Sequence, residues 1–157
     1  MTPYLMLASL VTWLIPALPQ TLALSSGVSD NRKLPIMISF NAGESAIVAL
    51  QFEIRMPVQR LATEASIAPG AAAKAAGKSV SCGGRWIKAP RMYAYTCIVA
   101  GGQQTIASGP IVELQLEPAS DVKRESYKIS VERILAIDSA GNHRRLKNVE
   151  AAVAALH

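Results

Sequence analysis

The stretch Val48-Ala49-Leu50-Gln51-Phe52-Glu53-Ile54-Arg55-Met56 alternates strictly between large apolar side chains and polar or small ones. Successive side chains of a β-strand point to opposite faces, so the apolar set lines one face and Gln51, Glu53 and Arg55 are expected to stay in water. A helix would scatter the same residues around its axis. Pro57 follows directly and bounds the strand, because proline cannot donate to a sheet ladder. The sequence therefore predicts a strand with one buried face.

Similar runs recur along the chain. Segments that alternate or are rich in β-forming residues lie at 34–40, 92–99, 112–116 and 127–131. After residue 131 the apolar positions shift phase, as a β-bulge within a strand would produce. Turn signals separate the runs, at Gly43, Gly83-Gly84, Gly101-Gly102, Ser108-Gly109-Pro110 and Gly141-Asn142. Short strands with such regular punctuation predict an all-β antiparallel sandwich or barrel.

Two segments do not follow the strand pattern. The Ala-rich stretch from Pro69 to Gly77 fits one helical turn or an ordered loop. The Ala-rich tail 146–156 places apolar residues at helical spacing, which predicts a short C-terminal helix. An isolated helix of this length is marginal in water, so docking on the sandwich, fraying or a last strand remain alternatives.

The N-terminal residues have the pattern of an export signal. No charged residue precedes Asp30, and the segment from Pro3 to Ile15 is almost wholly apolar. Two prolines then interrupt the apolar stretch, and Thr21 and Ala23 are small residues of the kind that a signal peptidase reads, so we expect cleavage after Ala23. The alternative is an uncleaved membrane anchor, because the apolar stretch approaches the roughly 20 residues that span a bilayer.

These patterns predict a signal peptide at 1–23, one sandwich domain at 24–146 and a tail at 147–157. The formal net charge of +5 belongs entirely to the part after the signal. Such a balance favours anionic polymers or lipid headgroups, but no basic tract is dense enough to predict nucleic-acid binding. We therefore expect a secreted protein with no nucleic-acid partner and no membrane contact after cleavage.

Cys82 and Cys97 are the only cysteines. An exported chain presents them to an oxidising compartment, so we expect a disulfide, worth roughly 3 kcal/mol in the chain-entropy model. Metal ligation and a catalytic thiol are the alternatives. Neither is supported, because the only histidines, His143 and His157, do not lie at ligand spacing from the cysteines.

The predicted turn after residue 137 combines polar side chains. Asp138, Ser139 and His143 are the residue types of a catalytic triad, but one turn is too local for them to converge on a substrate from separate elements. We expect no catalytic residues and no enzyme activity. Asp138 and Asn142 are candidate ligands of a small calcium site, since calcium prefers oxygen ligands. With one carboxylate nearby, a plain tight turn is the alternative, and no cofactor is expected.

The segment between the cysteines combines cations with an aromatic side chain. Arginine and aromatic residues concentrate where interfaces form, and a hairpin tip rarely needs them. We therefore predict a contact surface at this tip, made by Arg85, Trp86, Lys88 and Arg91. The alternative is that Trp86 folds down over the disulfide.

Tyr93 and Tyr95 share the parity of Cys97 on one predicted strand. Because sugar rings stack on exposed aromatic faces, the two tyrosines form an alternative binding face of the sheet. They lie outside if the residues between them face the core, and inside if the disulfide is buried. The sequence leaves both arrangements open.

Several segments, taken in order, resemble the cohesin-like modules of secreted bacterial proteins. They are Ala49–Phe52, Ala68–Cys82, Tyr95–Val99, Thr105–Val112 and Ala136–Asn142. The resemblance extends from about Leu24 to Leu146. It implies a jelly-roll β-sandwich of about nine strands, related to the carbohydrate-binding modules of cellulose-degrading systems and usually not an enzyme. Cohesins bind calcium-dependent dockerin modules through one sheet face.

The chain departs from that family in two features. It has no dockerin of its own, because duplicated calcium loops with aspartates at alternating positions are missing, and its Ala-rich tail replaces a strand-like ending. Together, residues and resemblance predict a secreted, non-catalytic binding module. Its expected partner is an extracellular polysaccharide or a dockerin-like protein module, in a system linked to polysaccharide catabolism. The alternative function is a structural or adhesion domain, held at the cell surface by an uncleaved N-terminal anchor.

Overall fold

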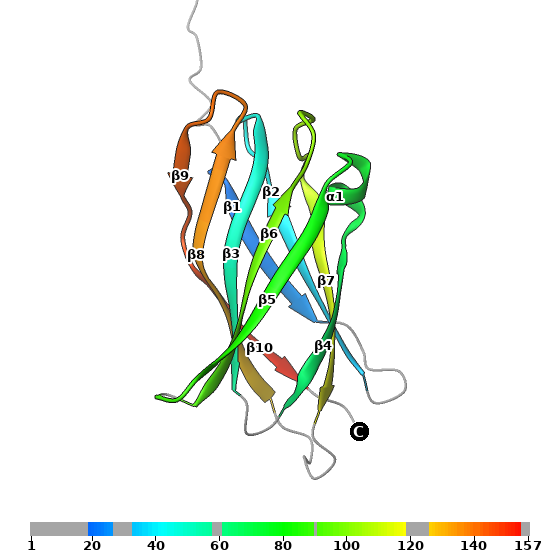
Figure 1. Cartoon of the computed structure of the whole chain (residues 1–157), viewed down its shortest axis with the longest axis vertical. Helices are drawn as coiled ribbons and strands as arrows, with labels where there is room; N and C mark the ends of the chain where they lie inside the picture. The colour runs from blue at the N-terminus through cyan, green and yellow to red at the C-terminus, as the bar shows by residue number, and fades with distance from the viewer. Residues whose placement is uncertain (1–18, 27–32, 58–60, 90, 119–125, 155–157) are drawn as a thin grey trace, which may run out of the picture.

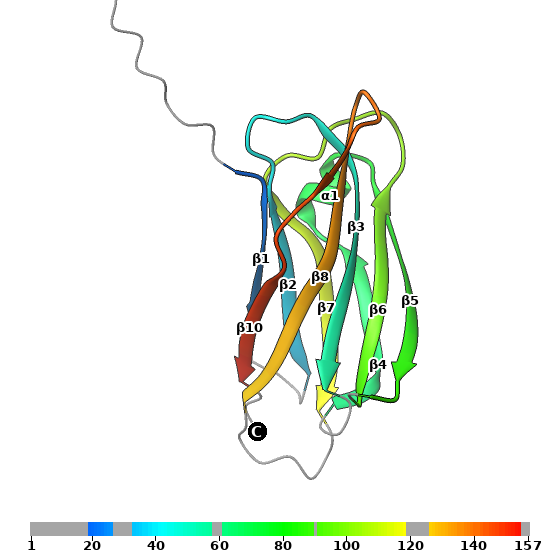
Figure 2. The same ribbon diagram turned by 90° about the vertical axis from the view of Figure 1, so that its left-hand side faces the viewer.

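The computed structural model describes residues 19–26, 33–57, 61–89, 91–118 and 126–154 (Figure 1). Within them, ten strands and one short helix form two sheets, in which every pairing is antiparallel. The two sheets pack face to face as two layers (Figure 2). The predicted all-β antiparallel sandwich is confirmed, with ten strands described where about nine were expected.

The smaller sheet has four strands. Their order is β1 (Thr21–Ser26), β2 (Leu34–Asn41), β7 (Gly109–Pro118) and β4 (Leu61–Pro69). Helix α1 (Ala71–Ala75) follows β4 at one end of the sandwich (Figure 1). The Ala-rich segment between Pro69 and Gly77 therefore does form one helical turn.

The larger sheet has six strands. Its order is β10 (Val149–Ala154), β8 (Ser126–Asp138), β3 (Ile47–Pro57), β6 (Met92–Ala100) and β5 (Ser79–Ile87). The short strand β9 (His143–Arg145) also pairs with β8, along a different part of that strand from β10. Strand β1 contacts β10, so the two sheets meet along this side of the sandwich (Figure 2).

Apolar side chains from both sheets fill the space between the layers. The alternation that begins at Val48 places Leu50, Phe52 and Ile54 fully inside. They meet buried residues of the other strands, among them Ile36, Ile38, Phe40, Val112, Leu114, Ile129 and Val131. Burying each large apolar side chain contributes about 1.5–3 kcal/mol. The predicted inner face of β3 is confirmed.

The outer face of β3 differs from the expectation at Glu53. Gln51 is exposed as predicted, but only 3 % of Glu53 is exposed to solvent. Arg55 of the same strand and Arg85 of β5 pair with the carboxylate and cover it. The prediction that Glu53 stays in water is therefore wrong, because strand alternation fixes the face of a side chain and not what covers it.

The predicted β-bulge is present in β8. Gln51 of β3 pairs with Leu135, whereas Glu53 pairs with Glu132, so β8 holds one extra residue between these two pairs. Arg133 lies in this bulge with φ 52°, a left-handed backbone that non-glycine residues rarely adopt. The bulge restores the inward direction of the apolar residues that follow it.

Strands β5 and β6 form a hairpin that carries the disulfide. Cys82 and Cys97 are bonded and lie directly opposite each other, with 4.1 Å between their Cα atoms. The expected disulfide is confirmed. Gly83-Gly84 is not a turn, however, and lies inside β5. A Cβ atom at residue 84 would lie 2.5 Å from Tyr93 Oη, so the glycine makes room for the tyrosine ring.

Both ends of the chain add strands. Residues 149–154 form β10 and pair with Ser126–Val131 of β8, so the expected C-terminal helix is wrong and the last-strand alternative holds. Pairing with the open edge of β8 satisfies backbone groups that a short isolated helix would leave to water.

At the N-terminus, the predicted cleavage site after Ala23 falls inside β1. Most of the predicted signal lies outside the described residues.

Among the described residues, no helix combines the length and the apolar character needed to cross a membrane.

Candidate functional site

The outer face of the six-stranded sheet presents its side chains in rows that cross the strands. One row, here called the Ile98 row, contains Ser81, Ile98, Gln51, Leu135 and Arg145, in the order β5, β6, β3, β8, β9. All five point away from the core, because their neighbours along each strand are buried or because they are themselves exposed. The row therefore crosses five strands on one continuous face of the sheet.

Ile98 is the prominent feature of this row. It is 46 % exposed although its strand is paired on both sides and its neighbours Cys97 and Val99 are buried. Leu135 is half-buried in the same row, and Ile137 is half-buried one step further along β8. Isolated exposed apolar residues need no explanation, but apolar side chains that gather on one open face are typical of interaction surfaces.

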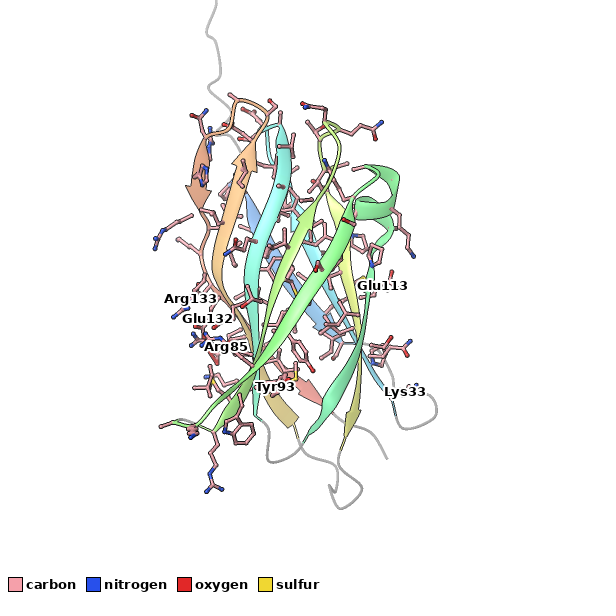
Figure 3. The ribbon with its side chains drawn as sticks, viewed as in Figure 1. Lys33, Arg85, Tyr93, Glu113, Glu132 and Arg133 are labelled. Atoms are coloured by element: carbon pink, nitrogen blue, oxygen red, sulfur yellow. A yellow bond between two sulfur atoms is a disulfide. The ribbon has the colours of Figure 1, made fainter. Side chains whose placement is uncertain are left out.

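The adjacent part of the same face is charged. Glu53 Oε2 lies 2.7 Å from Arg85 Nη2, and Glu53 Oε1 lies 2.6 Å from Arg55 Nε. Arg55 Nη1 also contacts Glu132 Oε2 at 2.8 Å, and Arg133 Nη1 stands 3.8 Å from Glu53 Oε2. Figure 3 shows Arg85, Glu132 and Arg133 gathered over this part of the sheet. We call these five residues the Glu53 cluster.

The Glu53 carboxylate is held in its charged form. Burial by itself raises the pKa of Glu53, because a charge loses water there. The hydrogen bonds donated by Arg85 and Arg55, together with their positive charges, outweigh burial and lower the pKa below its ordinary value of 4.5. The cluster thus ties β3, β5 and β8 together across the outer face.

The structure splits the predicted hairpin-tip surface. Arg85 faces outward and pairs with Glu53, whereas the next residue, Trp86, points to the opposite side of β5. Trp86 is 48 % exposed and pairs with Tyr93 rather than lying beside the disulfide. Lys88 and Arg91 are exposed where β5 turns into β6. The four residues therefore do not lie on one surface.

The alternative binding face, made by Tyr93 and Tyr95, required both side chains to lie on the outer face of the sheet. The structure places them on the inner face. Cys97 is fully buried and Tyr95 is only 7 % exposed. The rings of Tyr93 and Tyr95 lie 4.9 Å apart between their centroids, tilted by 56°. Because the disulfide faces the core, residues of the same parity follow it inward. The two tyrosines thus do not form an exposed sheet face.

In the turn after β8, the Asp138 carboxylate accepts hydrogen bonds from within the turn. Asp138 Oδ1 accepts hydrogen bonds from the backbone N–H groups of Ala140 and Asn142, and Oδ2 accepts one from Asn142 Nδ2. The Asn142 side chain and backbone, more than any other contact, lower the pKa of Asp138. Across the described ranges, no three His, Cys, Asp or Glu side chains gather as metal ligands. The geometry supports the tight-turn alternative for Asp138 and Asn142.

Reasoning from sequence missed the residues of the Ile98 row. Ile98 belongs to a strand rich in apolar residues on both parities, so its outward position follows only once Cys97 is known to face the core. Arg145 was missed because three residues of β9 are too few for a periodic pattern. The outward alternation of Gln51 was the available signal.

The sequence matches no protein-family model and no curated protein. Solved structures do match. A cohesin module from a family 33 glycoside hydrolase of Clostridium perfringens aligns with a TM-score of 0.62 at 10 % identity, covering 86 % of this chain and 93 % of that one. A chain of a type I cohesin–dockerin complex from Clostridium thermocellum gives a TM-score of 0.62 at 18 % identity, covering 85 % and 98 %.

A third match comes from an archaeon. The non-cellulosomal cohesin of Archaeoglobus fulgidus aligns with a TM-score of 0.56 at 11 % identity, covering 83 % of this chain and 89 % of that one. Identities this low establish likeness of fold only. The resemblance drawn from the sequence is thereby confirmed at the level of architecture: this chain has the cohesin fold.

Proposed function

We propose that this protein is a secreted, non-catalytic binding module whose Ile98 row docks a dockerin-like protein module. The observation that carries the proposal is Ile98 itself, 46 % exposed and flanked by Ser81 and Gln51 in the five-residue row. A structure with the same fold is described as a type I cohesin–dockerin complex. The biological setting that we propose is extracellular assembly linked to polysaccharide catabolism.

The chemistry of the row favours a protein partner over a polysaccharide. Sugar rings stack on aromatic faces, but the Ile98 row contributes aliphatic, amide, hydroxyl and guanidinium groups. Aliphatic side chains bordered by polar groups are typical of the buried centre and the polar rim of a protein interface. Direct polysaccharide binding is therefore the second outcome to test.

An extracellular location fits the disulfide between Cys82 and Cys97. Disulfides persist in oxidising compartments and are rare in the reducing cytosol. Export through the predicted N-terminal signal would place the module where secreted assemblies form.

The turn end of the β5–β6 hairpin is a second contact candidate on the same module. Trp86 is 48 % exposed there, and tryptophan is enriched among the residues that dominate binding energies. Lys88 and Arg91 are exposed cations in the turn that follows β5. Trp86→Ala is titrated beside Ile98→Asp in the experiment below, and a loss of binding from Trp86→Ala alone would move the contact to this turn.

The experiment is a calorimetric titration of a panel of recombinant dockerin modules, with calcium present. Ile98→Asp is compared with Met37→Asp, because Met37 is also an exposed large apolar residue, at 38 %, but lies on the other sheet. We expect at least one module to bind, Ile98→Asp to weaken it by about 100-fold or more, as for a hot-spot residue, and Met37→Asp to bind like wild type.

Two results would contradict this function. If no dockerin module binds while a glycan array gives a specific signal, the module binds polysaccharide directly. If Ile98→Asp and Met37→Asp bind alike, the Ile98 row is not the contact. Thermal unfolding of each variant shows that a loss of binding is not a loss of fold.

A further inference from the structure

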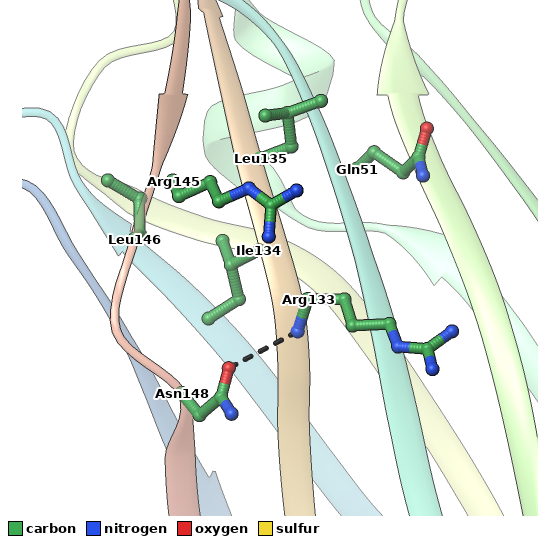
Figure 4. A pocket seen from close by; sticks show the side chains of 7 residues that line it. All are labelled: Gln51, Arg133, Ile134, Leu135, Arg145, Leu146 and Asn148. Atoms are coloured by element: carbon green, nitrogen blue, oxygen red, sulfur yellow. Dashed lines mark hydrogen bonds between the residues drawn. The ribbon is translucent and has the colours of Figure 1, made fainter.

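A pocket opens at the edge of the Ile98 row, where β8, β9 and the segment leading to β10 meet. Its volume is about 490 Å³, and Arg133, Arg145, Gln51, Leu135 and Asn148 contribute to its lining. Figure 4 shows the Arg133 and Arg145 side chains running in the same direction, away from β9 and toward β3. Two guanidinium groups from separate strands therefore flank one opening.

The backbone under Arg133 is fixed in an unusual conformation. Arg133 occupies the left-handed region, with φ 52°, and its N–H donates to Asn148 Oδ1 at 3.2 Å. Immediately next to it, the Leu146 N–H donates to the Ile134 carbonyl at 2.9 Å. Such strain in a non-glycine residue persists only where surrounding contacts impose it, and it concentrates at binding sites. Here the bulge and its hydrogen bonds fix the backbone position from which the Arg133 side chain extends.

The two arginines retain hydrogen-bonding capacity. Arg133 has only a long contact, 3.8 Å, to Glu53 Oε2, and that oxygen already accepts a 2.7 Å hydrogen bond from Arg85. The Arg145 side chain makes no hydrogen bond or ion pair within the described residues. None of the described residues that line the pocket carries a carboxylate. A guanidinium with free donors pairs best with a carboxylate or another oxyanion.

We propose that this pocket binds a carboxylate side chain from an acidic segment of the partner protein. The inference rests on the proposed function, because the pocket is continuous with the Ile98 row through Gln51 and Leu135. The aliphatic neighbours suit an Asp or Glu flanked by leucine-like residues. They offer no aromatic stacking surface for an acidic sugar.

The test uses two matched peptides, acetyl-Leu-Asp-Leu-Asp-Leu-amide and its Asn counterpart, titrated into the whole protein. Nuclear magnetic resonance follows the arginine Nε–H signals and the Gln51 side-chain amide. We expect the Asp peptide to shift the signals of Arg133, Arg145 and Gln51 in a saturable manner, and the Asn peptide to leave them in place. Arg145→Gln should weaken the Asp peptide about tenfold, which corresponds to one charge-assisted hydrogen bond.

Arg144→Gln is the control variant. Arg144 has the same charge on the same strand, but it pairs with the buried Ala136 in register and donates to Ser45 Oγ at 3.2 Å, away from the pocket. We expect it to change peptide affinity less than twofold. Equal losses from Arg144→Gln and Arg145→Gln would mean that only net charge matters, which overturns the pocket.

Two other outcomes would also overturn the inference. One is equal binding of the Asp and Asn peptides. The other is that oligoglucuronate saturates the same signals at lower concentration than the Asp peptide, which would assign the pocket to an anionic polysaccharide. The proposed function can fail independently of the pocket. If dockerin binding depends on Ile98 but not on Arg145, only the carboxylate pocket is contradicted. If the Asp peptide binds but no dockerin module does, only the proposed function is contradicted.

Discussion

Arg85 on β5 reaches across β6 to place its Nη2 atom 2.7 Å from Glu53 Oε2 on β3. The strand between them presents Ala94, which is fully buried although it lies opposite Arg85 and Arg55 on the outer face. A small side chain at this position allows the arginine to lie flat over the sheet. The outer face is therefore held together by a charge network as well as by its ladder.

The first prediction concerns Glu53. Glu53→Ala should lower the free energy of unfolding by about 1–3 kcal/mol, because Arg55 loses a hydrogen-bond partner where only about a fifth of its side chain is exposed. Arg85 and Arg133 are more exposed and can turn to water. Urea unfolding measures the change, with Glu44→Ala as the exposed control. Equal unfolding midpoints for the two variants would show that the cluster does not stabilise the fold.

The second prediction is the pH dependence of that contribution. The folded-state pKa of Glu53 lies below 4.5, so the unfolded chain binds more protons between the two pKa values and stability rises with pH across that window. The stabilisation by Glu53 should therefore be complete above pH 4.5 and fade as the pH falls through the folded-state pKa. Urea unfolding of wild type and Glu53→Gln at a series of pH values measures it. A stability gap that widens on acidification contradicts the sign.

The third prediction concerns the core. Phe52→Ala should cost about 3–5 kcal/mol, because a fully buried ring leaves a cavity between the sheets. Gln51→Ala, next to it on the opposite face, should change stability by less than about 0.5 kcal/mol. Denaturant unfolding compares the two, and similar midpoints would mean that the facing of β3 is reversed.

The fourth prediction separates backbone strain from side-chain contact at the bulge. Arg133→Gly and Arg133→Ala remove the same long contact to Glu53, but only glycine adopts φ near 52° without strain. We expect the Gly variant to be more stable than the Ala variant by about 1 kcal/mol. If thermal unfolding ranks Ala above Gly, the left-handed conformation carries no strain.

The fifth prediction concerns the N-terminal boundary. Strand β1 pairs with β2 from Thr21 onward, and Leu22 is buried. A recombinant chain that begins at Leu24 should therefore be less stable than one that begins at Pro19, by about 2–5 kcal/mol for the loss of one core leucine. Thermal unfolding of both decides this, and the intact mass of the secreted protein shows whether cleavage after Ala23 occurs. Equal stability would place β1 outside the cooperative unit.

Local patterns were sufficient for much of the architecture. The alternation from Val48 gave the inner face of β3, and the phase shift after Val131 gave the bulge, because both depend only on neighbours along one strand. The disulfide followed from two cysteines and a predicted export signal. The last strand did not follow, since the apolar residues at helical spacing in the Ala-rich tail predicted a helix, and the open edge of β8 that pairs with β10 is not visible in the sequence.

The candidate binding face depends on distances that a sequence does not contain. Besides Arg55, two residues away, Glu53 contacts Arg85 and Arg133, which lie 32 and 80 residues away along the chain, and this distant cover has no local signal. The outward direction of Ile98 depended on which way the disulfide faces. Arg85 and Trp86 are adjacent in sequence and were grouped for that reason, although a strand sends them to opposite faces.

The Ile98 row also sets a length scale. Neighbouring strands lie about 4.8 Å apart, so a row that crosses five strands, from Ser81 to Arg145, is about 19 Å long. An α-helix rises about 1.5 Å per residue, and about 13 residues would cover that length. Its pitch of about 5.4 Å is close to the strand spacing. A helix laid along the row would thus meet roughly one strand per turn, and the strand spacing would set which of its turns contact the sheet.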